Sequence, residues 1–210
     1  MIKIILVDDH AIVRKGIKAL LEEEKDIQIL GEADNYADVF TLLDKELPDL
    51  VMLDVDIPGR NGFEILKDIK VLYPPLKVLI LSMQSEDQFG LRAIKAGAYG
   101  YISKDNSNEE LRNAVRRVYE GRKYISSSVM EQLADVYDKG TDKPAHELLS
   151  DRELQILCMI SSGKPVTAIA GELSLSPATI ATYRSRVLKK LRLKSNVEMT
   201  AYAIRNHLIS

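Results

Sequence analysis

The sequence predicts two domains: a doubly wound α/β domain with a five-stranded parallel sheet, and then an all-α domain of four helices. Short apolar runs alternate with stretches of helical spacing as far as about residue 121. Strands that alternate with helices form parallel sheets covered on both faces. A polar, turn-rich stretch at 138–144 then precedes a region with helical patterns only. We therefore expect domains at 1–121 and 147–210, joined by a linker at 122–146.

Apolar runs place five buried strands in the first domain, at residues 2–7, 27–30, 50–53, 77–81 and 98–102. A helix is expected after each strand. The first, at 11–23, carries an apolar stripe that includes Ile12 and Leu21. Asn35 or its neighbour Asp34 is the candidate cap of the second, and a short helix at 129–137 is possible inside the linker.

Composition is typical of a soluble globular protein, with 46% hydrophobic and 29% charged residues. No apolar run approaches the ~18 residues of a membrane helix, and Asp8 follows the first apolar run too closely for a signal peptide. Cys158 is the single cysteine, so no disulfide can form within the chain. We expect a cytoplasmic protein with no membrane partner.

Charge is divided unevenly along the chain, although the total is −2. Residues 147–210 contain nine Lys/Arg and five Asp/Glu, whereas residues 1–146 contain 20 and 26. The basic C-terminal part is therefore a candidate to bind a polyanion.

Polar residues follow four of the predicted strands at the point where each ends. They are Asp8-Asp9, Asp54, Ser82 and Lys104. The carboxyl ends of parallel strands meet at one edge of the sheet, where binding sites form. Asp54 alone could be a loop cap before the Pro58-Gly59 turn, but that explanation would have to hold at all four strand ends. A shared site is the favoured interpretation.

Clustered carboxylates repel one another and persist when a cation shares their site. Oxygen ligands with room for water suit Mg²⁺. A lysine and a hydroxyl facing such a cation would stabilise a phosphoryl group during transfer. Asp54 is then the candidate nucleophile, because carboxylates form aspartyl-phosphates.

These residues, together with Tyr101, resemble the receiver domain of two-component response regulators over residues 2–121. The resemblance implies the following roles. Asp54 accepts a phosphoryl group from a sensor histidine kinase. Asp9, Asp54 and the backbone carbonyl of Asp56 hold Mg²⁺, and Asp8 acts through water. Ser82 and Lys104 contact the phosphoryl oxygens, and Ser82 with Tyr101 forms the switch.

Two positions depart from the receiver pattern. Asp105 stands where a proline, often with a cis bond, usually follows the lysine. Asp56 places an acidic group two residues after the acceptor, where it could repel the phosphoryl group or orient attacking water, so the lifetime of the phosphate is left open. Tyr101 could also be an ordinary core or edge-strand aromatic residue.

Four helices are predicted in the C-terminal domain. Ser150 and Glu153 form a capping box before the first. The second runs over 166–173. Ser176 caps the third, which starts at Pro177. The fourth, at 196–208, has an inward face with Met199, Ala203, Ile204 and Leu208.

The third of these helices and the residues after it carry Arg184, Arg186, Lys189, Lys190, Arg192 and Lys194, with no acidic residue between Pro177 and Val197. Two helices joined by a short turn, the second basic, are typical of a helix-turn-helix. Six cations suit phosphate neutralisation. A solvated amphipathic face is the alternative, but such a face usually mixes both signs.

The C-terminal part resembles the LuxR-type DNA-binding domain, through residues that include Leu149-Ser150-Asp151-Arg152-Glu153, Ile169-Ala170 and Lys190-Leu191. The order of the two domains resembles the NarL/FixJ group of response regulators. This implies that the third helix lies in the major groove of DNA and that the last supports dimerisation. The candidate contacts are Thr179, Thr182, Tyr183, Arg184, Arg186 and Lys190. Thr167, Ala168, Ala181 and Tyr183 depart from the usual residues, which leaves the strength of binding open.

The expected function is transcription regulation switched by phosphorylation of Asp54, which frees or dimerises the C-terminal domain for binding to double-stranded DNA. The protein would be a homodimer on DNA and no enzyme beyond a self-limited autophosphatase reaction. One alternative is a DNA-binding regulator that is insensitive to phosphorylation. Another is a phosphatase with an aspartate nucleophile, because Asp54-Val55-Asp56 resembles the Asp-x-Asp of haloacid dehalogenase-type enzymes.

Overall fold

A computed structural model describes residues 1–84, 86–138 and 144–209. The chain divides into two compact units, Met1–Leu133 and Ala134–Ser210, and each is described by itself. The turn-rich stretch predicted at 138–144 falls largely on residues 139–143, outside the described residues. The predicted domain bounds and linker bounds stay predictions.

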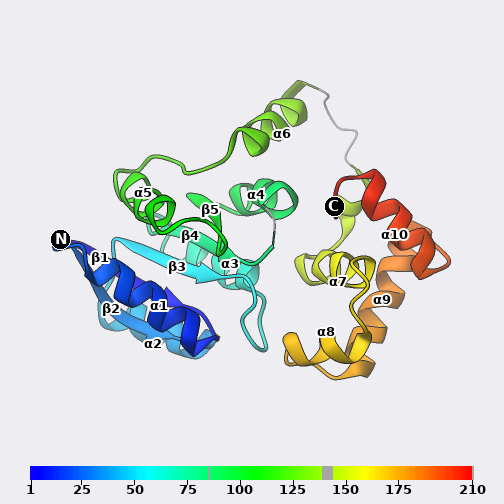
Figure 1. Ribbon diagram of the computed structural model, residues 1–210, viewed down its shortest axis with the longest axis horizontal. Coiled ribbons are helices and arrows are strands. Elements are labelled where there is room, and N and C mark those ends of the chain that lie inside the picture. The colour runs from blue at the N-terminus through cyan, green and yellow to red at the C-terminus, as the bar shows by residue number, and fades with distance from the viewer. Residues whose placement is uncertain (85, 139–143, 210) are drawn as a thin grey trace. The chain divides into compact units, whose positions relative to one another are not determined.

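The N-terminal unit is built on one parallel sheet (Figure 1). Its strands lie in the order β2-β1-β3-β4-β5. Their bounds are β1 Ile2–Val7, β2 Ile27–Ala33, β3 Leu50–Asp54, β4 Lys77–Ser82 and β5 Gly100–Ser103. Each neighbouring pair is parallel. This confirms the predicted doubly wound, five-stranded fold.

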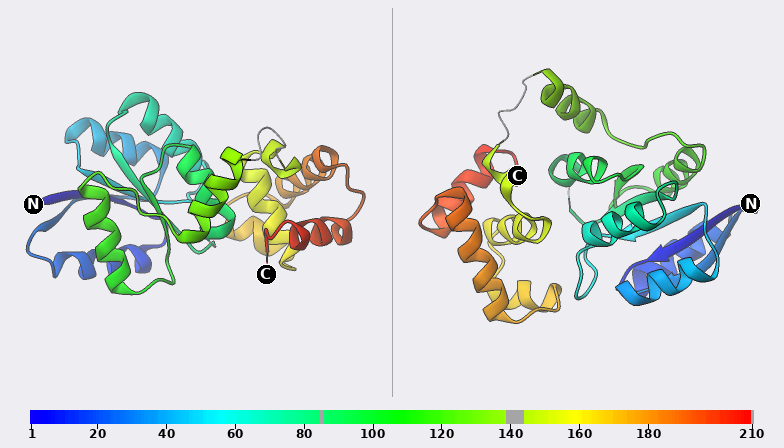
Figure 2. Two further views of the ribbon diagram at one scale, coloured as in Figure 1. Left: turned by 90° about the horizontal axis from the view of Figure 1, so that it is seen from above. Right: turned by 180° about the vertical axis from the view of Figure 1, so that it is seen from behind.

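Helices cover both faces of the sheet. Helices α1 (Ala11–Glu22) and α5 (Asn108–Tyr119) lie on one face, and α2 (Tyr36–Lys45), α3 (Gly62–Leu72) and α4 (Glu86–Lys95) lie on the other (Figure 2, left). Helix α6 (Ser127–Asp138) follows. All five residues of β3 are buried, because its side chains alternate between two covered faces.

Three local predictions for this unit need correction. Strand β2 continues to Ala33. Strand β5 begins at Gly100 rather than at residue 98, because Gly97 has a φ of 101° and the chain is still turning out of α4. Ile12 is 87% exposed. It lies nine residues before buried Leu21, or about 2.5 helical turns, and therefore points to the opposite side of α1.

The C-terminal unit is helical, with η1 Ala145–Leu148, α7 Asp151–Ser161, α8 Val166–Glu172, α9 Pro177–Leu191 and α10 Asn196–Arg205. The capping box of Ser150 and Glu153 is confirmed. Ser176 caps α9 as predicted. The prediction for α10 was partly wrong, because the helix ends at Arg205 and Ile204 is 56% exposed. Among the described residues, no helix is both long enough and apolar enough to span a membrane.

Candidate functional site

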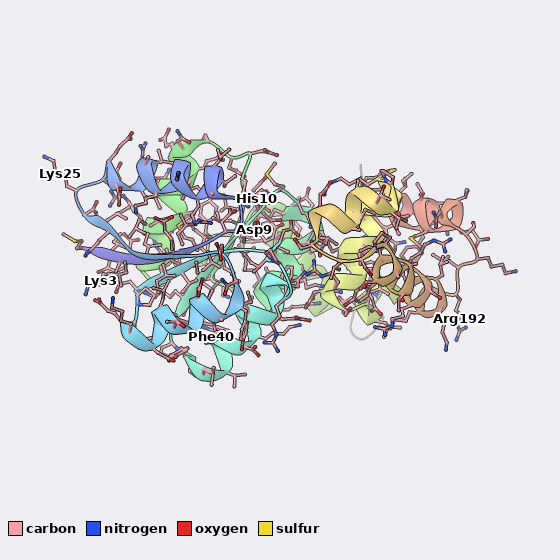
Figure 3. All side chains as sticks on the ribbon, turned by 90° about the horizontal axis from the view of Figure 1, so that it is seen from below. Lys3, Asp9, His10, Lys25, Phe40 and Arg192 are labelled. Atoms are coloured by element: carbon pink, nitrogen blue, oxygen red, sulfur yellow. The ribbon has the colours of Figure 1, made fainter. Side chains whose placement is uncertain are left out.

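Acidic side chains converge at the carboxyl end of the sheet in the N-terminal unit. Asp8, Asp9 and His10 directly follow the end of β1, and Asp54 is the last residue of β3. Each of these four offers a ligand atom, and the four atoms lie within 4.8 Å of one another. Figure 3 shows Asp9 and His10 close together at this end of the sheet, with Lys3 at the opposite end. The cluster exists because β1 and β3 are parallel neighbours.

Lys104 reaches this cluster from the end of β5. Its Nζ lies 2.7 Å from Asp8 Oδ2 and 2.7 Å from Asp54 Oδ2. The three side chains are almost fully buried, with exposed fractions of 6% for Lys104, 0% for Asp8 and 1% for Asp54. A buried ammonium group thus bridges two buried carboxylates that come from neighbouring strands.

Burial governs the ionisation of this trio. It raises the pKa of Asp54 to about 6; the Asp56 and Asp8 charges act in the same direction, and Lys104 opposes them. Burial by itself lowers the pKa of Lys104, but pairing with Asp54 and Asp8 outweighs it, so that pKa is raised. Lys104 therefore stays cationic at neutral pH. Asp54 is ionised at neutral pH, which is close to the pH range in which it takes up a proton.

The donor set suits a hard divalent cation. Asp54 Oδ1 accepts a hydrogen bond from Asp56 N at 3.2 Å, and Asp8 Oδ1 accepts one from His10 N at 2.8 Å. The cluster contains three carboxylates, and Lys104 pairs with two of them, so it keeps excess negative charge. Carboxylate oxygens are the ligands that Mg²⁺ prefers, usually together with water.

His10 was given no role by the sequence analysis, although it directly follows the two aspartates. Its Nδ1 lies 2.6 Å from Asp9 Oδ1, and its side chain is 61% exposed. The adjacency of a histidine to an Asp-Asp pair was the signal that could have identified it.

Ser82 and Tyr101 both hold the backbone of Gln84. Ser82 is buried at the end of β4, and its Oγ accepts a hydrogen bond from Gln84 N at 3.0 Å. Tyr101 is fully buried in β5, and its hydroxyl donates to Gln84 O at 2.9 Å. Burial raises the pKa of Tyr101, which keeps the phenol protonated as a donor. Gln84 was not identified from the sequence, because its contribution is made by backbone atoms.

The Lys104–Asp105 peptide bond is trans, since no described peptide bond is cis. Asp105 is exposed, and its backbone N donates to Ser103 Oγ at 3.3 Å. With aspartate in place of the usual proline, the peptide bond after Lys104 is therefore trans.

In the C-terminal unit, α8 and α9 are joined by residues 173–176 and pack on one another. Ile169 of α8 and Ile180 of α9 are fully buried. Ser176 Oγ accepts a hydrogen bond from Thr179 N at 3.1 Å, which fixes the start of α9. The exposed side of α9 has a shallow hollow. It is lined by Ala181, Thr182, Ser185, Arg186 and Lys189.

Comparison with known proteins assigns both units to families. The response regulator receiver domain matches residues 4–116, and the bacterial regulatory proteins of the luxR family match residues 147–203. The chain belongs to the two-component response regulators. It joins a receiver domain to a LuxR-type DNA-binding domain, which is the organisation of transcription regulators in this family.

Relatives of the same organisation align along nearly the whole chain. Response regulator GacA of Pseudomonas aeruginosa is 38% identical over 211 residues, covering 100% of this chain and 98% of the relative. Response regulator UvrY of Escherichia coli K12 is also 38% identical, with 99% and 96% covered. The solved structure of RcsB from Salmonella typhimurium is 25% identical, with a TM-score of 0.66 and 96% of each chain covered.

Two of the predicted contact residues of the LuxR-type domain line the shallow hollow on α9. Thr182 and Arg186 lie on the exposed side of α9, along the shallow hollow. Ser185 shares this hollow and was not predicted, because a lone serine in a basic helix gives no signal by residue type.

All of the predicted contacts also interact within the domain. The Thr182 hydroxyl donates to Ala178 O at 3.0 Å. Thr179 Oγ1 lies 2.8 Å from Ser176 Oγ. Arg184 Nε donates to Asn196 Oδ1 at 2.6 Å, and the Arg186 guanidinium lies 5.7 Å from the centre of the Tyr183 ring. Lys190 Nζ donates to Glu153 Oε2 at 2.6 Å. The roles of these residues in DNA binding stay predictions.

Proposed function

We propose that Asp54 is the phosphoacceptor of this response regulator and that its phosphorylation controls DNA binding by residues 147–210. The observation that carries this proposal is the position of Lys104 Nζ, 2.7 Å from the carboxylates of both Asp8 and Asp54. A fixed cation beside a buried carboxylate is what a phosphoryl group in transfer requires. We take 1–121 as the receiver and 122–146 as the linker.

The chemistry follows from the residues at the strand ends. An oxygen of Asp54 attacks phosphorus while the bond from phosphorus to the histidine nitrogen of a sensor kinase breaks, giving an acyl phosphate. Lys104 and Ser82 contact the transferred oxygens and stabilise their charge. Asp9, Asp54 and the Asp56 carbonyl would hold Mg²⁺, with Asp8 acting through water. The cation supplies charge neutralisation at the phosphoryl group.

The acyl phosphate is also open to hydrolysis. Asp56 stands two residues after Asp54, where its carboxylate can orient a water molecule, and the reaction would be a self-limited autophosphatase step. Such a step releases inorganic phosphate and returns Asp54 to its unphosphorylated state.

Binding to double-stranded DNA is assigned to the exposed side of α9. Thr182 and Arg186 are the proposed groove contacts, and the basic charge of the domain would neutralise DNA phosphates. A homodimer on DNA would place two α9 helices on two half-sites.

The decisive experiment is a DNA-binding titration at fixed salt, with and without beryllofluoride and Mg²⁺. Binding that tightens by about tenfold or more, about 1.4 kcal/mol, and that loses this gain in Asp54→Ala, supports the proposal. Asp34→Ala is the matched control, because Asp34 is an exposed aspartate after β2.

Two other results would replace the proposal. Equal binding by wild type and Asp54→Ala in every condition would indicate a regulator that is insensitive to phosphorylation. Steady release of phosphate from a small phosphoester would indicate a phosphatase.

A further inference from the structure

The residues between α5 and α6 lie along the outer edge of the sheet in the N-terminal unit. Tyr124 N donates to Tyr99 O at 2.9 Å, and Tyr101 N donates to Tyr124 O at 3.3 Å. Tyr124 thereby forms a parallel bridge with Gly100 of β5. The edge strand β5, which contains Tyr101, is thus paired with the linker on its open side.

The start of α6 is held on α4 by two polar contacts. Ser126 N donates to Glu86 Oε1 at 2.7 Å, so a side chain of α4 satisfies a backbone donor at the start of α6. Six residues further along, Gln132 Nε2 donates to Asp87 O at 2.9 Å.

Apolar packing adds to these contacts. Val129 of α6 is fully buried. A Cβ atom placed on Gly90 of α4 would lie 2.7 Å from Val129 Cγ2. A Cβ atom on Gly100 would lie 2.8 Å from Tyr124 O. The linker and α6 therefore occupy the space that missing side chains leave at two glycines.

The same part of α4 is connected to the phosphoacceptor site. Gln84 lies two residues before Glu86, and its backbone is held by Ser82 Oγ at 3.0 Å and by the Tyr101 hydroxyl at 2.9 Å. If the Ser82 side chain rotates to bring its hydroxyl to a phosphoryl group on Asp54, Oγ moves, and the hydrogen bond that it accepts from Gln84 N is lengthened or broken.

We propose that α4 and the edge of β5 form a docking surface for the first half of α6, and that phosphorylation weakens this docking through Ser82 and Gln84. The helix that leads toward the DNA-binding domain is then a direct reporter of the receiver state. The coupling to phosphorylation rests on the proposed function of Asp54; the docking itself does not.

Thiol labelling tests both parts in the full chain. Val129→Cys and, as matched control, Met130→Cys are each made in a Cys158→Ala background. Val129 is buried and Met130 is 55% exposed on the same helical turn. Docking predicts that the thiol at position 129 reacts at least ~10-fold more slowly with a thiol reagent than the thiol at position 130. Equal rates would overturn the docking surface.

Beryllofluoride with Mg²⁺ is expected to raise the labelling rate at position 129 by about fivefold, leave position 130 unchanged, and have no effect in Asp54→Ala. Fluorine NMR reports whether beryllofluoride binds Asp54. Bound fluoride without a change at position 129 would overturn the coupling and leave the proposed function intact. Absence of bound fluoride would overturn the proposed function, and the coupling with it.

Hydrogen exchange on a wedge variant provides a second measurement. Gly90→Ala is expected to speed exchange of the α6 amides about tenfold while it favours the helical state of α4. Adding Val129→Ala should restore slow exchange, because the added Cβ lies 3.8 Å from Val129 Cβ and its other close neighbour, Glu86 Cγ at 2.9 Å, belongs to a flexible side chain that can move aside. Slow exchange in Gly90→Ala, or fast exchange that the second substitution leaves unchanged, would contradict the packing of α6 on α4.

Discussion

Asp54→Asn is expected to stabilise the receiver domain at neutral pH in the absence of Mg²⁺, although it removes the proposed acceptor. Burial raises the pKa of Asp54 from 3.8 to about 6. A shift of about two units, at about 1.4 kcal/mol each, corresponds to roughly 3 kcal/mol. Asparagine has the same shape and carries no charge, so the variant avoids most of this cost. This value is an upper bound on the stability that the variant gains, because asparagine must also find hydrogen-bond partners.

The direction in which stability changes with pH follows from the number of protons bound in the folded and unfolded states. A carboxyl whose pKa is higher in the folded state binds more protons there than in the unfolded state, so stability falls as pH rises. The cost of ionising Asp54 is absent below about pH 4, grows between about pH 4 and 6, and stays constant above. The advantage of Asp54→Asn should follow the same curve.

Differential scanning calorimetry in EDTA at pH values from 4 to 7.5 measures this advantage. For a domain of this size, 3 kcal/mol corresponds to a rise in Tm of roughly 10 °C. Mg²⁺ should raise the Tm of the wild type and leave that of Asp54→Asn nearly unchanged. The exposed control Asp34→Asn should stay within about 0.5 kcal/mol of the wild type. If Asp54→Asn is less stable than the wild type at pH 7.5 in EDTA, or equally favoured at pH 4, the argument from burial is wrong.

Three further predictions concern other contacts. Lys104→Met leaves Asp8 and Asp54 buried without their cation. Urea denaturation at pH 7.5 should show a loss of about 3 kcal/mol in the free energy of unfolding, and addition of Mg²⁺ should make this loss smaller. No loss would mean that the ion pairs of Lys104 with Asp8 and Asp54 do not stabilise the domain. Ser150→Ala removes the N-cap of α7 and should cost about 1 kcal/mol in the transition of the DNA-binding domain only, as seen by calorimetry. Arg186→Gln should lower the slope of log Kd against log salt by ~1. Arg184→Gln should lower it less, because Arg184 is paired with Asn196; equal slopes would contradict this distinction.

The convergence of Asp8, Asp54 and Lys104 could be predicted from the sequence, because parallel topology alone determines it. Each residue directly follows an apolar run, and the carboxyl ends of parallel strands share one edge of the sheet. No side-chain detail was needed. The helix caps at Ser150 and Ser176 were predictable for a similar reason, since capping depends on residues three positions apart.

Contacts that depend on a neighbouring element could not be predicted in this way. Helical spacing indicates that α1 has an apolar stripe, but it does not say that Ile12 falls outside that stripe. Residue type and position make Lys190 a candidate DNA contact, but they do not show that it pairs with Glu153 from another helix. Gln84 contributes through backbone atoms, which residue type does not reveal.

The proposed coupling requires little energy, which is why it can work through one hydroxyl. A neutral hydrogen bond contributes about 1 kcal/mol to stability, and about 1.4 kcal/mol changes an equilibrium constant tenfold. If α6 is docked about ten times more often than not, loss of the bond from Gln84 N to Ser82 Oγ brings docked and undocked states close to equal populations. A large rearrangement of the sheet is therefore unnecessary. The buried Tyr101 hydroxyl keeps its own bond to Gln84 O, so the loop keeps one anchor while the other changes.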